Sequence, residues 1–148
     1  MMTTREINRA CLFRHTAAEH RHDMAETLAT LHADCHFEDR PVGLTLDGRE
    51  AAQRHYELWW GAFGIVTDEG RLHWAADDLV IGEAVFAGTH TGPFLGIAPT
   101  GRSVRFPFTV VVTFRDGLLA SEHFTYDLNG LLRQIGQPAF DPVGERII

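Results

Sequence analysis

Asp127 is the residue with the clearest potential for chemistry, because it stands between a strand-like pattern and a helical one. The run 119–126 is typical of a strand, and apolar residues at helical spacing follow Asp127. A carboxylate at a strand end beside an apolar helix could line the mouth of a pocket, where burial raises its pKa into the range of a general base. Aspartate at such a place also commonly caps the following helix, and the local pattern leaves both interpretations open.

His123 is a second candidate on the same strand. Strict alternation puts His123 and Asp127 on one face of this strand and Glu122 and Tyr126 on the other, and one of the two faces must point into the protein. On an inner face, His123 and Asp127 would lie roughly 13 Å apart, a spacing that suits opposite ends of a bound ligand. On an outer face, His123 would be an exposed or interface residue.

His90 is a third candidate, on an earlier strand where it shares an apolar face with Phe86. A neutral imidazole there could take part in acid–base chemistry or only support the fold through one hydrogen bond. The nine histidines include no HExxH pattern and no Cys/His pairs with zinc spacing, so we expect no bound metal.

Asp34, Glu38 and Asp39 form an acidic cluster near a predicted strand. Pro41 follows almost at once, and a proline marks the exit from a strand. We therefore expect these carboxylates to lie in a solvated turn.

The surrounding elements follow from pattern and capping signals. Thr3, Asp23 and Asp47 each precede an acidic residue by three positions, which predicts helices over 4–20, 24–31 and 48–63. Strand-like runs then occupy 71–76, 78–91, 103–115 and 118–127, with a tight Asp-Gly turn at 116–117 and a loop at 93–102. Helices followed by antiparallel strands favour an α+β fold, and 148 residues fit one domain over 1–148.

Several of these segments together resemble the SnoaL-like polyketide cyclases of the nuclear transport factor 2-like superfamily. The likeness rests on GTHTGPFLGIAPTG at 88–101, on Glu122, Phe124 and Asp127, and on LLRQIG at 131–136. It extends, less sharply, to ADCHFED at 33–39 and LDGREA at 46–51. The resemblance implies a cone in which a curved antiparallel sheet wraps around helices and encloses a deep apolar pocket.

In the cyclase branch, an aspartate that matches Asp127 acts as acid and base in an intramolecular aldol ring closure without a cofactor. A histidine at the position of His90 is a frequent part of the family motif, and Thr113 lies on the strand where cyclases place polar pocket groups. The superfamily also contains isomerases, epoxide hydrolases and non-catalytic binding domains, so fold alone does not decide function. In the isomerase-like relatives, a carboxylate in the region of Asp34, Glu38 and Asp39 can serve as the base. Candidate pocket walls are aromatic: Phe37, Tyr56, Trp59, Trp60, Phe106 and Phe108.

Composition narrows the partners. The net charge of −7 without a basic stripe argues against nucleic acid, and the short apolar runs argue against a membrane span. No signal-peptide pattern or nucleotide-binding loop occurs, so we expect a cytoplasmic protein that uses no cofactor. Cys11 and Cys35 are expected to be buried free thiols.

The sequence thus favours an enzyme that binds a small apolar oxygenated molecule and performs ring closure or a related isomerisation by acid–base catalysis. The alternative is a non-catalytic ligand-binding or dimerisation module of the same fold. A homodimer is expected on the outer sheet face, because 103–115 is interpreted as apolar on both faces, with Val104 and Val111 opposite Phe106. The tail 138–148 is expected to pack along the surface or against a second subunit.

Overall fold

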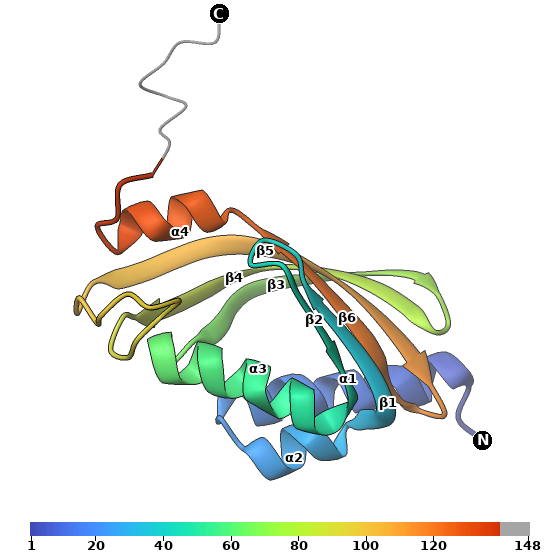
Figure 1. Cartoon of the computed structure of the whole chain (residues 1–148). Coiled ribbons are helices and arrows are strands. Elements are labelled where there is room, and N and C mark those ends of the chain that lie inside the picture. The colour runs from blue at the N-terminus through green and yellow to red at the C-terminus, as the bar shows by residue number, and fades with distance from the viewer. Residues whose placement is uncertain (140–148) are drawn as a thin grey trace, which may run out of the picture.

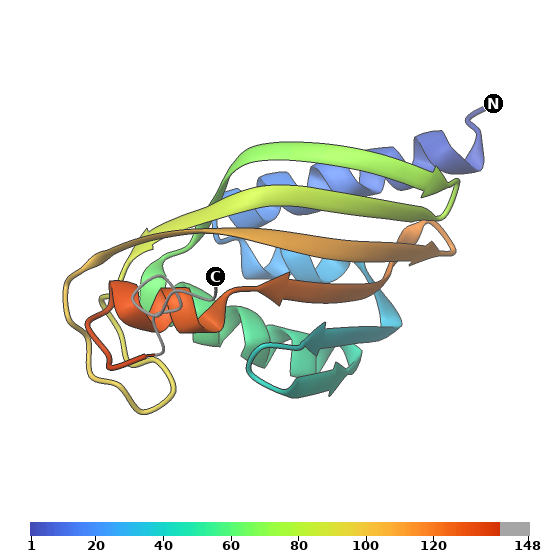
Figure 2. The ribbon, with the colours of Figure 1, turned by 90° about the horizontal axis from the view of Figure 1, so that it is seen from above.

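The structure, a computed structural model, describes residues 1–139, in which a curved six-stranded sheet wraps around helices (Figures 1 and 2). The strand order across the sheet is β2-β1-β6-β5-β4-β3. The helices are α1 (Thr4–His20), α2 (Met24–Ala29), α3 (Gly48–Phe63) and α4 (Leu128–Gln134). The strands are β1 (Leu31–Asp39), β2 (Leu44–Asp47), β3 (Val66–Ala76), β4 (Leu79–Thr89), β5 (Ser103–Arg115) and β6 (Leu118–Tyr126).

The expected α+β fold is confirmed, with one difference in the sheet. The paired strands are antiparallel except β1 and β6, which run parallel. The parallel pair arises because the chain crosses from β1 through α3 and the β3–β5 meander before β6 returns beside β1.

Side-chain caps set two of the three predicted helix starts. Thr3 and Glu6 form a reciprocal capping box at α1, and the Asp23 side chain accepts from the Glu26 amide at α2. Asp47 precedes α3 as predicted but makes no capping bond with its side chain. Its carboxylate instead accepts from Nδ1 of His36 at 2.7 Å, because β1 lies beside β2.

Strands β4 and β6 are slightly shorter than predicted, so His90 lies just beyond the end of β4, and two other boundaries differ for reasons that burial and pairing explain. The second helix ends at Ala29 rather than residue 31, because Leu31 is fully buried at the start of β1. Strand β3 begins at Val66 rather than residue 71, since Val66 already pairs with Ala87 of β4. Its residues are mostly exposed, so apolar alternation could not reveal this edge strand.

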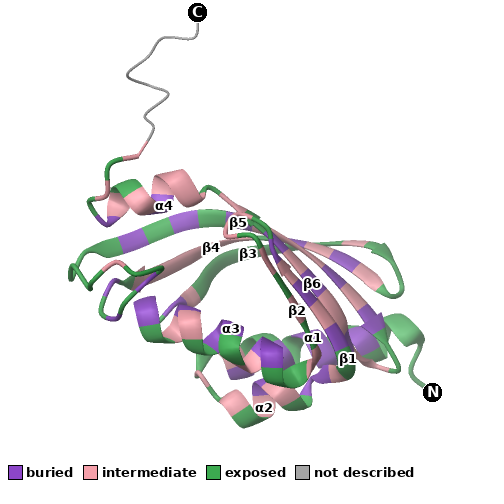
Figure 3. Cartoon of the chain, in the orientation of Figure 1, coloured by how far each residue is buried: buried purple, intermediate pink, exposed green. Residues whose placement is uncertain are grey.

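The sheet has a distinct inner face, visible as alternating burial along β5 and β6 (Figure 3). On β5, buried Val104, Phe106 and Phe108 alternate with exposed Arg105 and Pro107. Val104 therefore lies on the inner face, not the outer face assigned to it from sequence. The outer face of β5 is more polar than expected, which weakens the argument for a homodimer there.

The hairpin turn and the two cysteines agree with the sequence predictions. The turn between β5 and β6 has positive φ at Asp116 and Gly117, as expected for an Asp-Gly hairpin. Cys11 and Cys35 are buried free thiols, and burial raises the pKa of each. None of the helices in residues 1–139 is long and apolar enough to cross a membrane. The prediction for the tail falls almost wholly on 140–148, outside the described residues.

Candidate active site

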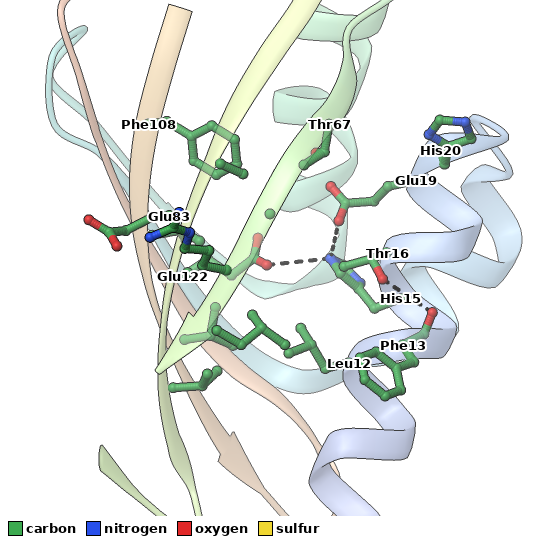
Figure 4. A pocket seen from close by; sticks show the side chains of 18 of the residues that line it. Leu12, Phe13, His15, Thr16, Glu19, His20, Thr67, Glu83, Phe108 and Glu122 are labelled. Carbon is green, nitrogen blue, oxygen red and sulfur yellow. Dashed lines mark hydrogen bonds and ion pairs between the residues drawn. The ribbon is translucent and has the colours of Figure 1, made fainter. Parts of the chain in front are cut away.

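A cavity of about 450 Å³ lies between α1 and the inner face of the sheet (Figure 4). Apolar side chains form most of its wall, and the rings of Phe86 and Phe108 stack there with centroids 3.7 Å apart. Phe13 of α1 and Leu72 of β3 also line the cavity and are about half exposed, which places them toward its opening. The cavity is thus an apolar pocket of the size used for small molecules.

Three polar residues of the cavity wall, His15 and Glu19 of α1 and Glu122 of β6, point toward one another (Figure 4). Nε2 of His15 lies 2.8 Å from Oε1 of Glu19 and 3.4 Å from Oε1 of Glu122. The spacing of His15 and Glu19 by one helical turn puts both on the inner side of α1. Glu122 reaches them because β6 alternates and Glu122 lies on its inner face.

The hydrogen bonds around His15 favour its protonated form. Thr30 Oγ1 donates to the Thr27 carbonyl, so it accepts from Nδ1 of His15 at 2.7 Å. Nε2 then faces the two carboxylates. Burial opposes the charged imidazolium, but Glu19 and Glu122 outweigh it and raise the pKa of His15 well above its ordinary value.

Glu122 is buried and has one free oxygen. Its side chain is 5% exposed, and within the described residues its Oε2 has no hydrogen-bond partner. Burial raises the pKa of Glu122, and His15 only partly offsets this effect. Burial together with the Glu122 charge also raises the pKa of Tyr56, whose hydroxyl lies 3.5 Å from Nε2 of His15. The Glu122 carboxyl group therefore has the environment of a general base.

A second buried polar centre surrounds Asp39 at the end of β1. Its Oδ2 accepts from Nε2 of His55 at 2.8 Å and from Nε1 of Trp59 at 2.9 Å, and its Oδ1 accepts from the Tyr126 hydroxyl at 2.7 Å. These groups line a small cavity of about 30 Å³ that shares Glu19, Phe86 and Phe124 with the larger one. Asp39 is 1% exposed, so the solvated turn expected from sequence is wrong for this residue.

The structure gives Asp127 a different place from the one a buried base needs. Asp127 is exposed at the start of α4, and its Oδ1 accepts from the Gly130 amide at 2.9 Å. It lines neither of the two cavities. Of the two interpretations left open by the sequence, the geometry matches helix capping, and the role of general base loses its structural support.

The two candidate histidines also lie outside the cavities. His123 is on the outer face of β6, opposite in direction to Glu122, and its Nδ1 lies 3.3 Å from Arg40 Nη2. His90 is fully buried, and its Nδ1 accepts from the Thr100 amide at 3.2 Å. Its backbone also bonds at one end of the 93–102 loop, to Arg102 and Gly101. His90 therefore holds this loop, as the structural interpretation expects.

The predicted wall residues divide among several places. Phe108 lines the large cavity, and Tyr56, Trp59 and Trp60 line the small one. Phe37 and Phe106 are buried in the core and line neither. Thr113 lies on the outer face of β5, where its hydroxyl bonds that of Ser121.

Sequence reasoning missed His15, Glu19, Glu122 and His55. A signal for Glu122 existed: an acid between alternating apolar residues of a strand whose other face is polar. No local signal pairs it with His15, which lies on a helix at the other end of the chain.

Comparison with known proteins supports the architecture. The profile of the SnoaL-like polyketide cyclase family matches residues 9–135. A proposed polyketide cyclase from Xanthomonas campestris is 18% identical, with 90% of this chain and 99% of that one covered and a TM-score of 0.82. A second proposed polyketide cyclase, from Pseudomonas putida, is 20% identical, with 90% of this chain and 98% of that one covered and a TM-score of 0.79.

A third solved structure is a protein from Catenulispora acidiphila with a ketosteroid isomerase-like fold, in complex with trimethylamine. It is 22% identical, with 89% of this chain and 97% of that one covered and a TM-score of 0.74. At these identities the solved structures establish the fold alone. No curated protein matches the chain. The profile match spans most of the sequence, and the chain therefore belongs to the SnoaL-like polyketide cyclase family.

Proposed function

We propose that this protein is a small-molecule enzyme in which Glu122, assisted by His15, moves a proton on an apolar oxygenated ligand bound in the large cavity. The observation that carries the proposal is the buried Oε2 of Glu122, which has no hydrogen-bond partner in residues 1–139 and lies at the wall of an apolar cavity. A buried carboxylate oxygen without a protein donor is available to accept a proton from a ligand.

The reaction class follows from the kind of base. A carboxylate of raised pKa suits removal of a proton from a carbon next to a carbonyl group. The resulting enolate can attack a second carbonyl of the same molecule, and the new alkoxide then recovers the proton from Glu122. In an isomerisation, the proton returns instead to another carbon of the enolate. Both routes leave Glu122 ionised again and need no external reactant.

His15 and Glu19 have a supporting role in this scheme. The imidazolium of His15 stabilises the ionised form of Glu122, and Glu19 holds the imidazolium in place through the same nitrogen, Nε2. The stacked rings of Phe86 and Phe108 offer a flat apolar wall, which suits a ring-containing molecule.

The second candidate is ligand binding without catalysis. It is favoured by the neighbour from Catenulispora acidiphila, a protein of the same fold in complex with a small molecule, trimethylamine. The two candidates differ in their expectation for Glu122→Gln: binding alone tolerates the change with altered affinity, whereas the enzyme loses turnover.

The first experiment is mass spectrometry of small molecules retained by the purified protein, followed by incubation of each with fresh protein. Conversion of a retained carbonyl compound to a cyclised or isomerised product supports the enzyme. Retained molecules that come back unchanged support the binding module.

A further inference from the structure

We propose that the outer face of β1 and β6 carries a binding site for a divalent transition metal, with Zn²⁺ as the reference ion, built from His36, Glu38 and His123. This site is independent of the proposed function, because the outer face of the sheet points away from the large cavity.

The parallel pairing of β1 and β6 brings the three side chains together. Glu38 and His123 are direct neighbours across the pair, and His36 lies two residues before Glu38 on the same face of β1. The two imidazole rings have centroids 5.8 Å apart. One ligand atom from each residue lies within 4.8 Å of the others. Two imidazoles and one carboxylate form a donor set that binds Zn²⁺ and related ions.

The two histidines lie near different oxygens of Glu38, at distances close to those between the ligands of one ion. In a tetrahedral site with bonds of about 2.0–2.1 Å, ligand atoms lie roughly 3.3–3.4 Å apart. His36 Nε2 is 3.2 Å from Glu38 Oε1, and His123 Nδ1 is 3.9 Å from Glu38 Oε2. The three side chains are about one third exposed, so small rotations are open to them and an ion can enter from solvent.

Asp47 orients one of the ligands. Nδ1 of His36 donates to Oδ1 of Asp47 at 2.7 Å, which leaves Nε2 facing Glu38. A carboxylate on the far nitrogen of a histidine is the usual support of a metal ligand, since it fixes the ring and raises its basicity. The same bond explains why Asp47 does not cap α3 with its side chain.

The guanidinium of Arg40 shows that the proposed site favours a cation, and it would compete with a metal ion for the same ligands. Its Nε donates to Glu38 Oε2 at 3.0 Å, and its Nη2 lies 3.3 Å from His123 Nδ1. The guanidinium therefore contacts two of the three proposed ligands. The Arg40 side chain is 59% exposed, so it can swing into solvent when an ion binds. Removal of Arg40 should therefore strengthen metal binding.

The experiment measures Zn²⁺ binding to the tag-free full chain by calorimetry, and Co²⁺ binding by visible absorption. We expect one ion per chain and the intense absorption of tetrahedral Co²⁺. His123→Gln and Glu38→Gln should each weaken binding at least tenfold, and Arg40→Gln should strengthen it. The matched control is His73→Gln, which removes the histidine of an exposed pair with Glu83 and should leave binding unchanged.

A second group of donors, His15, Glu19 and Glu122, lies on the inner side, and Glu19→Gln separates the two. Zn²⁺ binding that Glu19→Gln weakens and His123→Gln does not would overturn the proposal. So would equal affinity of His123→Gln and the wild-type chain, or weaker binding by Arg40→Gln. Circular dichroism of each variant without metal confirms that the fold is kept, and Glu38→Gln provides the test if His123→Gln does not fold.

Discussion

Replacement of Glu122 by glutamine tests the proposed base most directly. Glutamine keeps the shape of the side chain but has no ionisable group, so it cannot accept a proton from carbon. A positioned general base contributes about 10²–10⁴-fold to a rate, equivalent to roughly 3–5 kcal/mol of activation free energy. We therefore expect Glu122→Gln to lose most turnover of the true substrate while it still binds that substrate.

The effect of the same change on stability follows from the contacts of Glu122. His15 keeps its shorter contact with Glu19, at 2.8 Å, and loses only the longer contact with Glu122, at 3.4 Å. Near pH 4.5 we expect the free energy of unfolding to change by no more than about 1 kcal/mol. Burial raises the pKa of Glu122 above 4.5 in the folded chain, so the folded chain binds the proton of Glu122 more tightly than the unfolded chain does. The stability that this carboxyl group contributes is therefore fully present below pH 4.5 and is lost as the pH rises through the folded pKa. Glutamine does not titrate, so Glu122→Gln avoids this loss and should be more stable than the wild-type chain at pH values above 4.5. The expected gain is about 1.4 kcal/mol for each tenfold difference in the acid dissociation constant of Glu122 between the folded and unfolded chains.

Asp127→Asn is the matched control, because it makes the same chemical change at the exposed cap of α4. Asparagine caps helices as well as aspartate does, so turnover and stability should stay close to those of the wild-type chain. The assays are turnover against pH, ligand affinity by calorimetry, and denaturant unfolding at several pH values. Full turnover by Glu122→Gln, or a large loss in Asp127→Asn, would refute the assignment of the base.

Three further predictions concern the fold and assembly. Asp39→Asn should lower the free energy of unfolding, measured with denaturant, by about 1–3 kcal/mol for each of the donors of His55, Trp59 and Tyr126 that is left without an acceptor. Unchanged stability would contradict the hydrogen bonds assigned to Asp39. Gly92→Ala should lower the melting temperature strongly, because a Cβ at this position would lie 2.1 Å from the carbonyl oxygen of Gly61. The control is Gly61→Ala: a Cβ there meets open space on α3, so the melting temperature should stay the same or rise. A homodimer stays a prediction, and light scattering that gives a monomer at micromolar concentration would exclude it.

Helix starts and the long strands could be predicted because their signals are local. Thr3 and Asp23 cap their helices, and the β5–β6 hairpin turns at its Asp-Gly pair. The exposed edge strand β3 has no buried face over most of its length, so its first residues carry no alternation to detect. The short α2 shows the opposite limit: its apolar pattern continued to Leu31, but Leu31 begins β1 and is fully buried there.

The candidate site could not be predicted in the same way, because it joins distant parts of the chain. Alternation divided β6 correctly into two faces, but only the curvature of the sheet decides which face is inside. The resemblance drew attention to Asp127, whose place between strand and helix also fits a cap. The inner face carries Glu122 instead, and its partner His15 comes from α1, near the other end of the chain.

The two buried carboxylates, Asp39 and Glu122, differ in how many of their oxygens already accept hydrogen bonds. Asp39 receives hydrogen bonds from His55, Trp59 and Tyr126, so both of its oxygens are engaged and it has little capacity left for a ligand. Within the described residues, Glu122 contacts His15 at 3.4 Å and has one oxygen without a hydrogen-bond partner, beside a cavity that a small molecule can fill. A buried acceptor without a donor destabilises a fold, and a protein retains such a group where a ligand supplies the missing partner. This contrast is the physical reason for placing the base at Glu122 rather than at Asp39.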